Sequence, residues 1–505
     1  MRVSSPAMLT CRSMIVALVL IHGCGDSGEA GTDPQTSSAT DGTTAPTSSP
    51  TDATSEGTTD SPGTDTGTSA PTSGSSGEET LGTTSDPTTG AEEMAWVVPL
   101  RGVQVTSMAR DPNGDLVIAG YQYGSLSAVG GTELAEINDL FATFLVRIDP
   151  AGAVKWHRSF DTNSQPMATV EPVLAVAIGP SGEVVLAGMY NKAVDLGDGP
   201  LPSASDNDLF LAAFTADGAP LWSRGLSAPG AQYGSAVAIG PSGDIFLGGA
   251  FEEQITVGGD VLVSKGGTDI MLAKFTSAGE ATWGRAYGDA YEDAALGLAL
   301  DGAGDLVMLA MIYGDIADLG AGPIADLSCC TWNGVVAKFD ADGLNAWAVA
   351  NDGFSSSGAK SLAICPDGSV IAATGDGLVA RSSAGAALWG LGDKGLAVDG
   401  VACDSSGEVL AAGHILGGAV TDLGDGPLGP FAADPALVAR FSGGGALLSK
   451  SLISATSPVA VESHLIEPGP AGEVTFVVST AFGDIQVDFG DGPVAGDAFL
   501  VRRHD

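Results

Sequence analysis

The chain has 505 residues, of which 20 are Lys or Arg and 61 are Asp or Glu, so its formal net charge is −41. This charge repels phosphate backbones and anionic membrane surfaces, and no basic stripe with interleaved aromatic residues appears. We therefore exclude nucleic acid as a partner, and we expect contact with a membrane only through a lipid anchor.

The first 23 residues have the pattern of a secretory signal peptide. Arg2 and Arg12 precede the apolar run of residues 14–21, which is too short to span a bilayer. The run ends in Ile-His-Gly-Cys at 21–24, which resembles the lipobox of bacterial lipoproteins, although His22 departs from the residue usual at that place. The resemblance implies that Cys24 carries the lipid and that the protein is anchored in a bacterial cell envelope, at the outer membrane or cell surface. The alternative is an ordinary signal peptide followed by an incidental cysteine.

Residues 24–93 have the composition of a disordered stalk. Thr, Ser, Gly, Pro, Asp and Glu dominate, Leu81 is the only large aliphatic residue, and aromatic residues, Lys and Arg are absent. Such a segment buries too little apolar surface to offset the entropy lost on ordering. A flexible coil of this length reaches roughly 45 Å, so the stalk would hold a domain clear of a membrane surface.

A ten-residue pattern is repeated along the rest of the chain. GPSGEVVLAG at 179–188 is nearly the same as GPSGDIFLGG at 240–249, and related text brings the number of copies to seven. In each copy a glycine follows a turn-forming pair and precedes a β-branched run, which predicts a tight turn that leads into a strand. The shared glycines are Gly114, Gly182, Gly243, Gly304, Gly368, Gly407 and Gly472.

A small residue precedes this glycine by five positions in six of the seven copies. The seventh copy has Glu467 there, or a register shifted by one residue. Crowding of the innermost strands around the axis of a β-propeller explains the preference, and packing between sheets is the alternative. The small residues are Ala109, Ala177, Ala238, Ala299, Ala363 and Ala402.

A second recurring segment, such as VAKFDADGLNAW at 336–347, reads as strand, turn and strand, which gives four strands per unit. The final unit ends without its fourth strand, and residues 95–100 resemble a fourth strand that has no predecessor. The sequence therefore predicts an all-β fold, a single seven-bladed β-propeller of four-stranded blades over residues 94–505. The N-terminal strand completes the last blade and so removes the exposed sheet edges.

These segments resemble the bacterial SBBP-type β-propeller repeat of secreted and surface proteins. The resemblance covers about Met94 to Asp505 and rests on the glycine turn and on the pattern LVAKFD-x-x-G-x-x-x-W. It implies the fold and no common ligand. We expect a monomeric binding or scaffold module that contacts a protein or glycan at the cell surface through the longer loops of one face.

Three of these loops contain nearly the same text, VDLGDGPL at 194–201, TDLGDGPL at 421–428 and VDFGDGPV at 487–494. We interpret each as a small hairpin turned by Asp-Gly. The alternative is a calcium site, the only cofactor the sequence suggests, although the spacing lacks the oxygens of a full calcium loop. The paired acids are Asp195 with Asp198, Asp422 with Asp425, and Asp488 with Asp491.

A basic residue recurs near the end of the third predicted strand of every unit except the second, where Ala213 stands. We interpret it as a side chain whose stem lies between sheets and whose charge pairs with local carboxylates. The alternative is an anion-binding ring. The residues are Arg147, Lys274, Lys338, Arg381, Arg440 and Arg502.

No catalytic pattern is evident in the sequence. The four histidines after the signal peptide have no metal-ligand spacing, and there is no G-x-S-x-G motif. The alternative function is an extracellular enzyme on this fold, either polysaccharide-active or similar to the quinoprotein dehydrogenases. TADGAPLW at 215–222 faintly resembles the tryptophan-docking repeats of the latter, but seven units differ from their usual eight.

Four cysteines remain after Cys11 and Cys24 are accounted for, and an exported chain oxidises its cysteines. Cys329 and Cys330 lie in a long loop and are the candidate disulfide, whereas Cys365 and Cys403 lie at turn ends near the opposite face. This separation excludes bridges between the two groups. Cys365 and Cys403 either bridge neighbouring blades or remain thiols, and strand alternation favours thiols.

Overall fold

The computed structural model describes residues 93–504 apart from 124–125, 137–140, 163–173, 203–205, 315–316, 329–330, 352–360, 375–376, 393–394, 457–459, 481–484 and 490–492. The predicted signal peptide, Cys24 and nearly all of the predicted stalk lie outside the described residues. Among the described residues, the only helical segment is the short turn η1 (Pro470–Gly472), and no helix there is long and apolar enough to cross a membrane.

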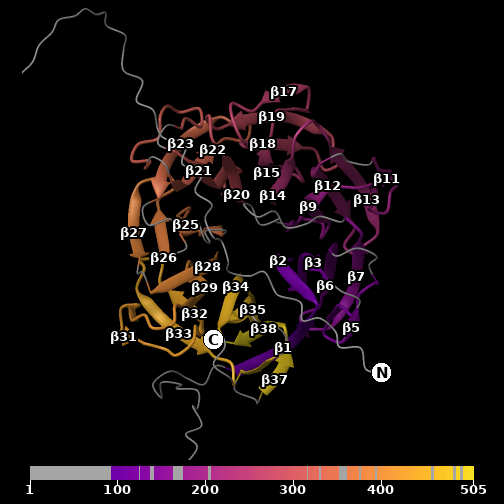
Figure 1. The fold of residues 1–505 in the computed structure, drawn as a ribbon. Helices are drawn as coiled ribbons and strands as arrows, with labels where there is room; N and C mark the ends of the chain where they lie inside the picture. The colour runs from indigo at the N-terminus through magenta and orange to yellow at the C-terminus, as the bar shows by residue number, and fades with distance from the viewer. Residues whose placement is uncertain are drawn as a thin grey trace, which may run out of the picture. The chain divides into compact units, whose positions relative to one another are not determined.

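The described residues form seven antiparallel sheets of four blade strands each, arranged in a ring (Figure 1). This confirms the predicted seven-bladed propeller. Blade 1 contains β2 (Val103–Arg110), β3 (Leu116–Gln122), β6 (Ala142–Ile148) and β7 (Val154–Phe160). Blade 2 contains β8 (Ala175–Ile178), β9 (Val184–Tyr190), β12 (Asp208–Phe214) and β13 (Pro220–Leu226). Blade 3 contains β14 (Gln232–Ile239), β15 (Ile245–Phe251), β18 (Asp269–Phe275) and β19 (Ala281–Tyr287).

The remaining blades repeat this order. Blade 4 contains β20 (Asp293–Leu300), β21 (Leu306–Tyr313), β22 (Trp332–Phe339) and β23 (Asn345–Asn351). Blade 5 contains β24 (Leu362–Ile364), β25 (Val370–Ala373), β26 (Gly377–Arg381) and β27 (Ala387–Gly392). Blade 6 contains β28 (Leu396–Cys403), β29 (Val409–Ile415), β32 (Ala436–Phe441) and β33 (Leu447–Ile453). Blade 7 contains β34 (Val461–Pro468), β35 (Val474–Thr480), β38 (Ala498–His504) and β1 (Glu93–Arg101).

The ring closes through β1, as the sequence predicts. This N-terminal strand pairs antiparallel with the C-terminal strand β38, with Val97 opposite Val501 and Leu100 opposite Ala498 (Figure 1). The outer edge of β1 is covered in turn by a hairpin of blade 1, formed by β4 (Ala128–Val129) and β5 (Thr132–Glu133). Blade 7 is therefore a six-stranded sheet, and its closing strand is held on both sides.

The glycine turns between first and second strands are built as predicted. All seven shared glycines have φ between +81° and +88°, the left-handed region in which a Cβ atom is unfavourable. In blade 2, for example, the amide of Gly182 donates to the carbonyl oxygen of Gly179 at 2.9 Å. The sequence pattern that identifies the seven units is thus the one that forms these turns.

Four of the six alanines that lie five positions before the shared glycine pack in hydrophobic clusters between sheets. Ala363 and Ala402 are buried in hydrophobic clusters that join blades 5 and 6 and blades 6 and 7, respectively. Glu467 pairs with Thr475 in the register in which Ala109 pairs with Val117. Glu467 is therefore the true equivalent of the alanines, and the alternative of a shifted register is wrong.

The hydrophobic core lies between neighbouring blades. One cluster packs Leu211 of blade 2 against Leu247 of blade 3, and another packs Leu410 of blade 6 against Phe476 of blade 7. These side chains are at most 1% exposed. Because most of the apolar burial occurs between blades, each blade depends on its neighbours for stability.

Candidate functional site

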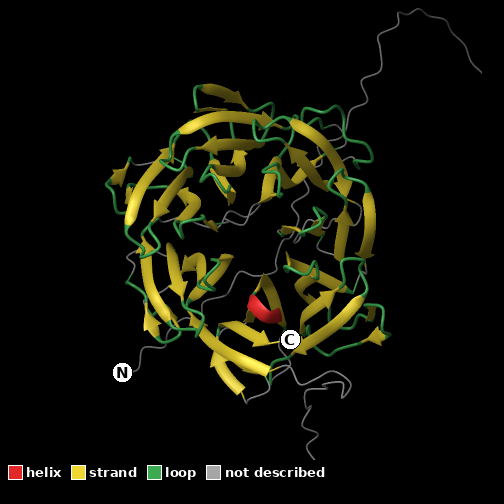
Figure 2. Ribbon diagram, turned by 180° about the vertical axis from the view of Figure 1, so that it is seen from behind, coloured by secondary structure: helices red, strands yellow, loops and turns green. Residues whose placement is uncertain are grey.

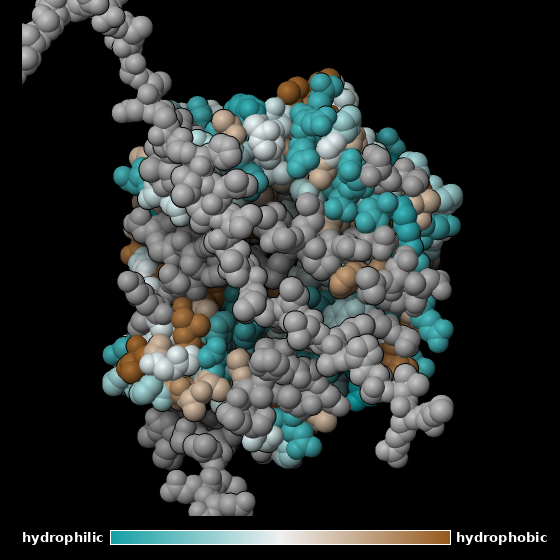
Figure 3. Space-filling model, in the orientation of Figure 1, coloured by the Kyte–Doolittle hydropathy of each residue, from teal (hydrophilic) through white to brown (hydrophobic). Residues whose placement is uncertain are grey.

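The two faces of the ring have different connections. On the turn face, tight turns join the first strand to the second and the third to the fourth, and η1 of blade 7 belongs to this face (Figure 2). The loop face carries the blade-to-blade connections and the inserts between second and third strands. Figure 3, drawn in the orientation of Figure 1, shows a mixture of hydrophilic and hydrophobic colouring where residues are described, and one of its brown areas lies at the rim over β17 (Asp260–Val263). Val261 and Val263 of this strand are 58% and 56% exposed.

The repeated D-L/F-G-D-G-P text forms hairpins, as predicted. They are β10 (Val194–Asp195) with β11 (Pro200–Leu201), β30 (Thr421–Asp422) with β31 (Pro427–Leu428), and β36 (Ile485–Asp488) with β37 (Pro493–Gly496). In the first, Asp195 Oδ1 accepts the amides of Gly197 and Gly199 at 2.8 and 3.2 Å. The first acid of each described motif therefore shapes the turn.

Blade 4 carries a fourth copy that the sequence comparison missed. Residues 318–323 read DLGAGP, and Asp318 Oδ1 accepts the amides of Gly320 and Gly322 at 2.7 and 3.0 Å. Ala321 replaces the second acid, so the turn forms without it. The signal for this copy was the spacing of the aspartate and glycines rather than the acid pair.

The second acid of the motif contacts the outermost strand of its own blade. Asp198 Oδ2 accepts the amide of Ser223 at 2.9 Å, and Asp425 pairs with Lys450. Both described pairs of acids thus have partners within the protein. Among the described residues, no three His, Cys, Asp or Glu side chains are grouped so that they hold a metal ion.

The recurring cations pair with acids of the turn face, which confirms our interpretation for five of the six. Three of them also reach a turn of the next blade: Arg147 donates to Gly182 O, Arg440 to Gly472 O and Arg502 to Pro150 O. The ion pairs are Arg147 with Asp111 and Asp115, Lys274 with Asp244, Lys338 with Asp301 and Asp305, Arg440 with Asp404 and Glu408, and Arg502 with Glu473.

Arg381 is the exception. In blade 5, Ala380 pairs with Trp389, which is the pairing that the recurring cation makes with a tryptophan in other blades. Arg381 lies one residue later and donates to the carbonyl oxygens of Ala350 and Gly385. Placing Arg381 in the set was therefore wrong by one strand position.

Tryptophans of the fourth strands dock on the next blade. Each ring lies against the glycine of the neighbouring turn between third and fourth strands, and five of the six indole nitrogens donate to a carbonyl oxygen of that turn at 2.8–3.1 Å. The contacts are Trp96 on Gly152, Trp156 on Gly218, Trp222 on Gly279, Trp283 on Gly343, Trp347 on Gly385 and Trp389 on Gly445. In blade 6 the equivalent position of the fourth strand is Ser449 instead of a tryptophan. The next blade, blade 7, has no turn between its third and fourth strands on which a ring could dock, because these strands are the C-terminal β38 and the N-terminal β1.

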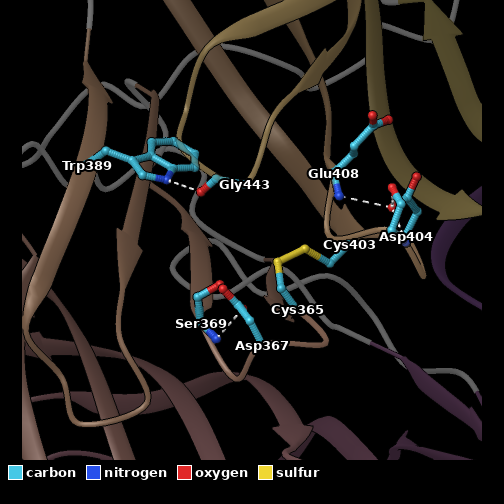
Figure 4. Close-up of a disulfide and its surroundings, with 9 residues drawn as sticks. Cys365, Asp367, Ser369, Trp389, Cys403, Asp404, Glu408 and Gly443 are labelled. Carbon is cyan, nitrogen blue, oxygen red and sulfur yellow. Dashed lines mark hydrogen bonds between the residues drawn. A yellow bond between two sulfur atoms is a disulfide. The ribbon is translucent and has the colours of Figure 1, made fainter.

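A disulfide joins Cys365 of blade 5 to Cys403 of blade 6, with their Cα atoms 5.1 Å apart (Figure 4). The expectation of free thiols is therefore wrong. Strand alternation does not apply, because β24 ends at Ile364 and Cys365 already belongs to the turn. The candidate bridge between Cys329 and Cys330 lies outside the described residues and stays a prediction.

A hollow of about 530 Å³ adjoins this disulfide on the turn face. Its acids already have partners: Asp301 pairs with Lys338, Asp404 pairs with Arg440, and Asp367 accepts from Ser369 Oγ at 2.6 Å. These contacts hold the side chains of the acids in the turns, so the polar groups of the hollow have a structural role.

The loop face of blade 4 presents three aromatic rings in contact. The ring centroids of Tyr291 and Tyr313 are 5.6 Å apart, and those of Tyr313 and Trp332 are 5.2 Å apart. Tyr291 is 48% exposed. A Cβ atom on Gly314 would lie 3.2 Å from the Tyr291 ring and 3.7 Å from Asp289 Oδ2, so a carboxylate lies beside the aromatic surface.

Two buried acids lie directly beneath this aromatic cluster of Tyr291, Tyr313 and Trp332. Asp293 accepts the amides of Asp289 and Tyr313 at 2.9 and 3.3 Å, and Asp269 accepts the amide of Lys265 at 3.2 Å. Burial raises the pKa of Asp293 to about 7 and that of Asp269 to about 6. The acids therefore hold the backbone beneath the rings, and their burial favours the uncharged carboxyl.

A second polar group, missed by sequence reasoning, lies between blades 6 and 7. It consists of Asp399, His414, Glu462, His464 and Ser479, which we call the histidine cluster. The Nδ1 atoms of both histidines lie 3.8 Å from Asp399 Oδ2, and His464 Nε2 lies 2.5 Å from Ser479 Oγ. Spacing along the chain gave no signal for this group, because its members are brought together by two blades.

Comparisons with known proteins give the fold alone. No family model and no curated protein matches the chain. Among solved structures, the Dos1 propeller is similar over 82% of this chain and 95% of its own, at 11% identity and a TM-score of 0.44. A Bacteroides caccae protein of unknown function is similar over 61% and 89%, at 12% identity and 0.32. The mitotic checkpoint complex is similar over 86% and 99%, at 11% and 0.42. Similarity at this level is no argument for a function.

Proposed function

We propose that the protein is an exported, lipid-anchored surface propeller that binds a protein or glycan through its loop face. The observation that carries the binding function is the aromatic cluster of Tyr291, Tyr313 and Trp332. Aromatic rings with a few polar groups beside them are typical of binding sites, because they offer much contact area with little loss of side-chain entropy. Tyr313 ends β21 and Trp332 begins β22, so two of the rings are fixed on a sheet, and Tyr291 of the connection between β19 and β20 packs on Tyr313.

The location of the protein is proposed from three features. Residues 1–23 have the signal-peptide pattern, Cys24 has the lipobox context, and residues 24–93 have the composition of a stalk. The Cys365–Cys403 bridge supports this proposal, because disulfides persist mainly in oxidising compartments. The proposed site of anchoring is the outer membrane or the cell surface.

Anchoring is tested by Cys24→Ala in the producing bacterium. We expect the variant to leave the membrane fraction, and the wild-type N-terminal peptide to carry a lipid mass. Retention of the variant in that fraction, with no lipid on the wild-type peptide, would refute the anchor.

Binding is tested with Tyr291→Ala on a glycan array and on intact cells. The matched control is Tyr123→Ala, which removes a tyrosine that is 41% exposed after β3 of blade 1 on the same face. We expect Tyr291→Ala to lower binding at least tenfold and Tyr123→Ala to leave it unchanged. Equal binding by both variants and wild type would contradict a site at the aromatic cluster.

A further inference from the structure

Three side chains of the histidine cluster are arranged in the order of a nucleophile, a base and an orienting acid. Ser479 Oγ lies 2.5 Å from His464 Nε2, and Asp399 Oδ2 lies 3.8 Å from Nδ1 on the opposite side of the same ring. A serine hydroxyl is a weak nucleophile until such a base accepts its proton. The acid lies just beyond hydrogen-bond distance, a separation that catalytic groups often show before a substrate binds.

Local irregularities of two inner strands bring these groups together. The pairing of β28 with β29 shifts between Val398 and Gly400, which leaves Asp399 as the extra residue of a bulge. The pairing of β34 with β35 shifts between Ser463 and Ile466, and His464 lies in that shift. Equivalent shifts occur in β2, β14 and β20, so the bulge belongs to the repeat. A bulge redirects side chains. Here the two shifts allow residues of two blades to meet.

Additional charge surrounds the imidazole ring. Glu462 Oε2 lies 3.6 Å from His464 Nε2, so an imidazolium formed at His464 has a carboxylate near each nitrogen. His464, Asp399 and Glu462 have side chains that are 26%, 20% and 30% exposed, so the group is accessible without being fully solvated.

We propose that Ser479, His464 and Asp399 form a nucleophilic site that hydrolyses carboxylic esters. Ser479 Oγ attacks the ester carbonyl carbon while its proton passes to His464 Nε2, and the C–O bond to the leaving alkoxide breaks as His464 returns that proton. Water then attacks the acyl-serine ester, gives its proton to His464, and releases the carboxylic acid and the free serine. Asp399 is a positioning residue that orients the ring and stabilises the imidazolium. This activity is independent of the proposed binding function.

The test uses the purified full chain and a fluorophosphonate, which forms a stable bond only with an activated serine. We expect mass spectrometry to find the label on the peptide that contains Ser479. Ser479→Ala and His464→Gln should each lower the rate of labelling and the kcat/KM for p-nitrophenyl acetate at least 100-fold. The control Ser405→Ala removes an exposed serine of the turn face and should change neither quantity.

The role of Asp399 needs a readout other than stability. Asp399→Asn should lower the labelling rate about tenfold or more, whereas Asp399→Glu, which keeps the carboxylate, should recover part of it at an equal melting temperature. A folded wild-type protein that takes up no label, or takes it up at a serine other than Ser479, would overturn the proposal. So would an esterase activity that persists in Ser479→Ala.

Discussion

Two carboxyl groups on the loop face are buried against each other, and their protonation is coupled to the stability of the fold. Asp269 and Asp293 are completely buried, and the described residues offer no hydrogen-bond partner for Asp269 Oδ1. A Cβ atom on Gly288 would lie 2.8 Å from that oxygen and 2.7 Å from Asp293 Oδ2, so only glycine fits between the acids. Lys265 and Asp289 are the other charged groups that act on this acid pair.

The acid pair makes stability depend on pH in a definite direction. Burial raises the pKa of Asp293 from 3.8 to about 7, so the unfolded chain loses this proton more readily than the folded chain. The contribution to stability is therefore fully present below about pH 4 and is lost as pH rises through 7. We expect the melting temperature of the wild type to fall from pH 5 to pH 8 by about 2–5 °C more than that of Asp293→Asn.

A matched control separates this effect from general charge repulsion. A hydrogen bond from Ser369 lowers the pKa of Asp367. Asp367→Asn should therefore show the same change in melting temperature between pH 5 and pH 8 as the wild type. Thermal unfolding followed by circular dichroism measures all three proteins. Parallel pH curves for the wild type and Asp293→Asn would show that Asp293 does not titrate in this range.

The disulfide is a second feature that depends on single residues. Cys365 and Cys403 are 38 residues apart and join blades 5 and 6. Removing a bridge of this kind typically costs about 2–4 kcal/mol. We expect Cys365→Ser, Cys403→Ser and the double variant to lose the same stability in a urea titration, because each breaks one bond. Peptide mapping that joins either cysteine to Cys329 or Cys330 would contradict the assignment of strands to blades.

Some residues depart from what their repeat unit predicts, and the departures have local causes. Strand alternation does not apply to Cys365, because this residue lies in a turn. Arg381 does not follow the cation pattern, because it lies one residue after the position that pairs with the tryptophan. The histidine cluster was hidden because its residues come from two blades. Sequence comparison between units identifies what the units share, whereas these features depend on what one unit or one junction has alone.

At the scale of elements, the repeated coupling between blades is a tryptophan on a glycine. The glycine has two roles, because its φ is positive and because a neighbouring ring occupies the place of a Cβ atom. At Gly218, φ is +77° and a Cβ atom would lie 2.7 Å from the Trp156 ring. At Gly407, φ is +87° and nothing lies within 4 Å of a Cβ atom. A comparison of substitutions at Gly218 and Gly407 therefore separates the cost of backbone strain from the contribution of tryptophan docking.

We expect Gly218→Ala to destabilise the protein more than Gly407→Ala. Both variants adopt a left-handed conformation that costs about 1–2 kcal/mol. Only Gly218→Ala also displaces Trp156, which adds about 1–3 kcal/mol by overpacking. The midpoint of urea unfolding measures the difference, and near-ultraviolet circular dichroism reports the tryptophan environment. Equal losses in the two variants would mean that docking contributes nothing to stability.

At the scale of the whole molecule, the architecture follows from the sequence because closure has a local signature. Seven glycine turns give the number of blades, and a fourth strand without a predecessor at 95–100 pairs with a last unit that lacks one. The hairpin β4–β5 that covers β1 was not predicted, since the insert of blade 1 has no repeated text. The gap in the ring of tryptophans at Ser449 lies between blades 6 and 7, where the turn next to the C-terminus is missing.

Closure is tested by deleting residues 94–100. The deletion removes Val98 and Leu100, which are 5% and 0% exposed, and leaves β38 as an unpaired edge. An exposed edge of this kind pairs with other chains, so we expect aggregation in size-exclusion chromatography and a large loss of melting temperature. As a control, the deletion of residues 40–46 removes seven residues of the predicted stalk. It should change neither the elution in size-exclusion chromatography nor the melting temperature.

Closure is also tested by adding a synthetic peptide with the β1 sequence, EMAWVVPLR, to the chain that lacks residues 94–100. The peptide presents to β38 the backbone groups that the deletion removed, and strand addition of this kind is a common mode of recognition. We expect it to restore a monomer of the shortened chain, whereas a peptide with Trp96→Ala should restore less, because Trp96 Nε1 donates to Pro150 O at 3.1 Å and so links blade 7 to blade 1. If the shortened chain is a stable monomer without any peptide, the ring does not depend on β1.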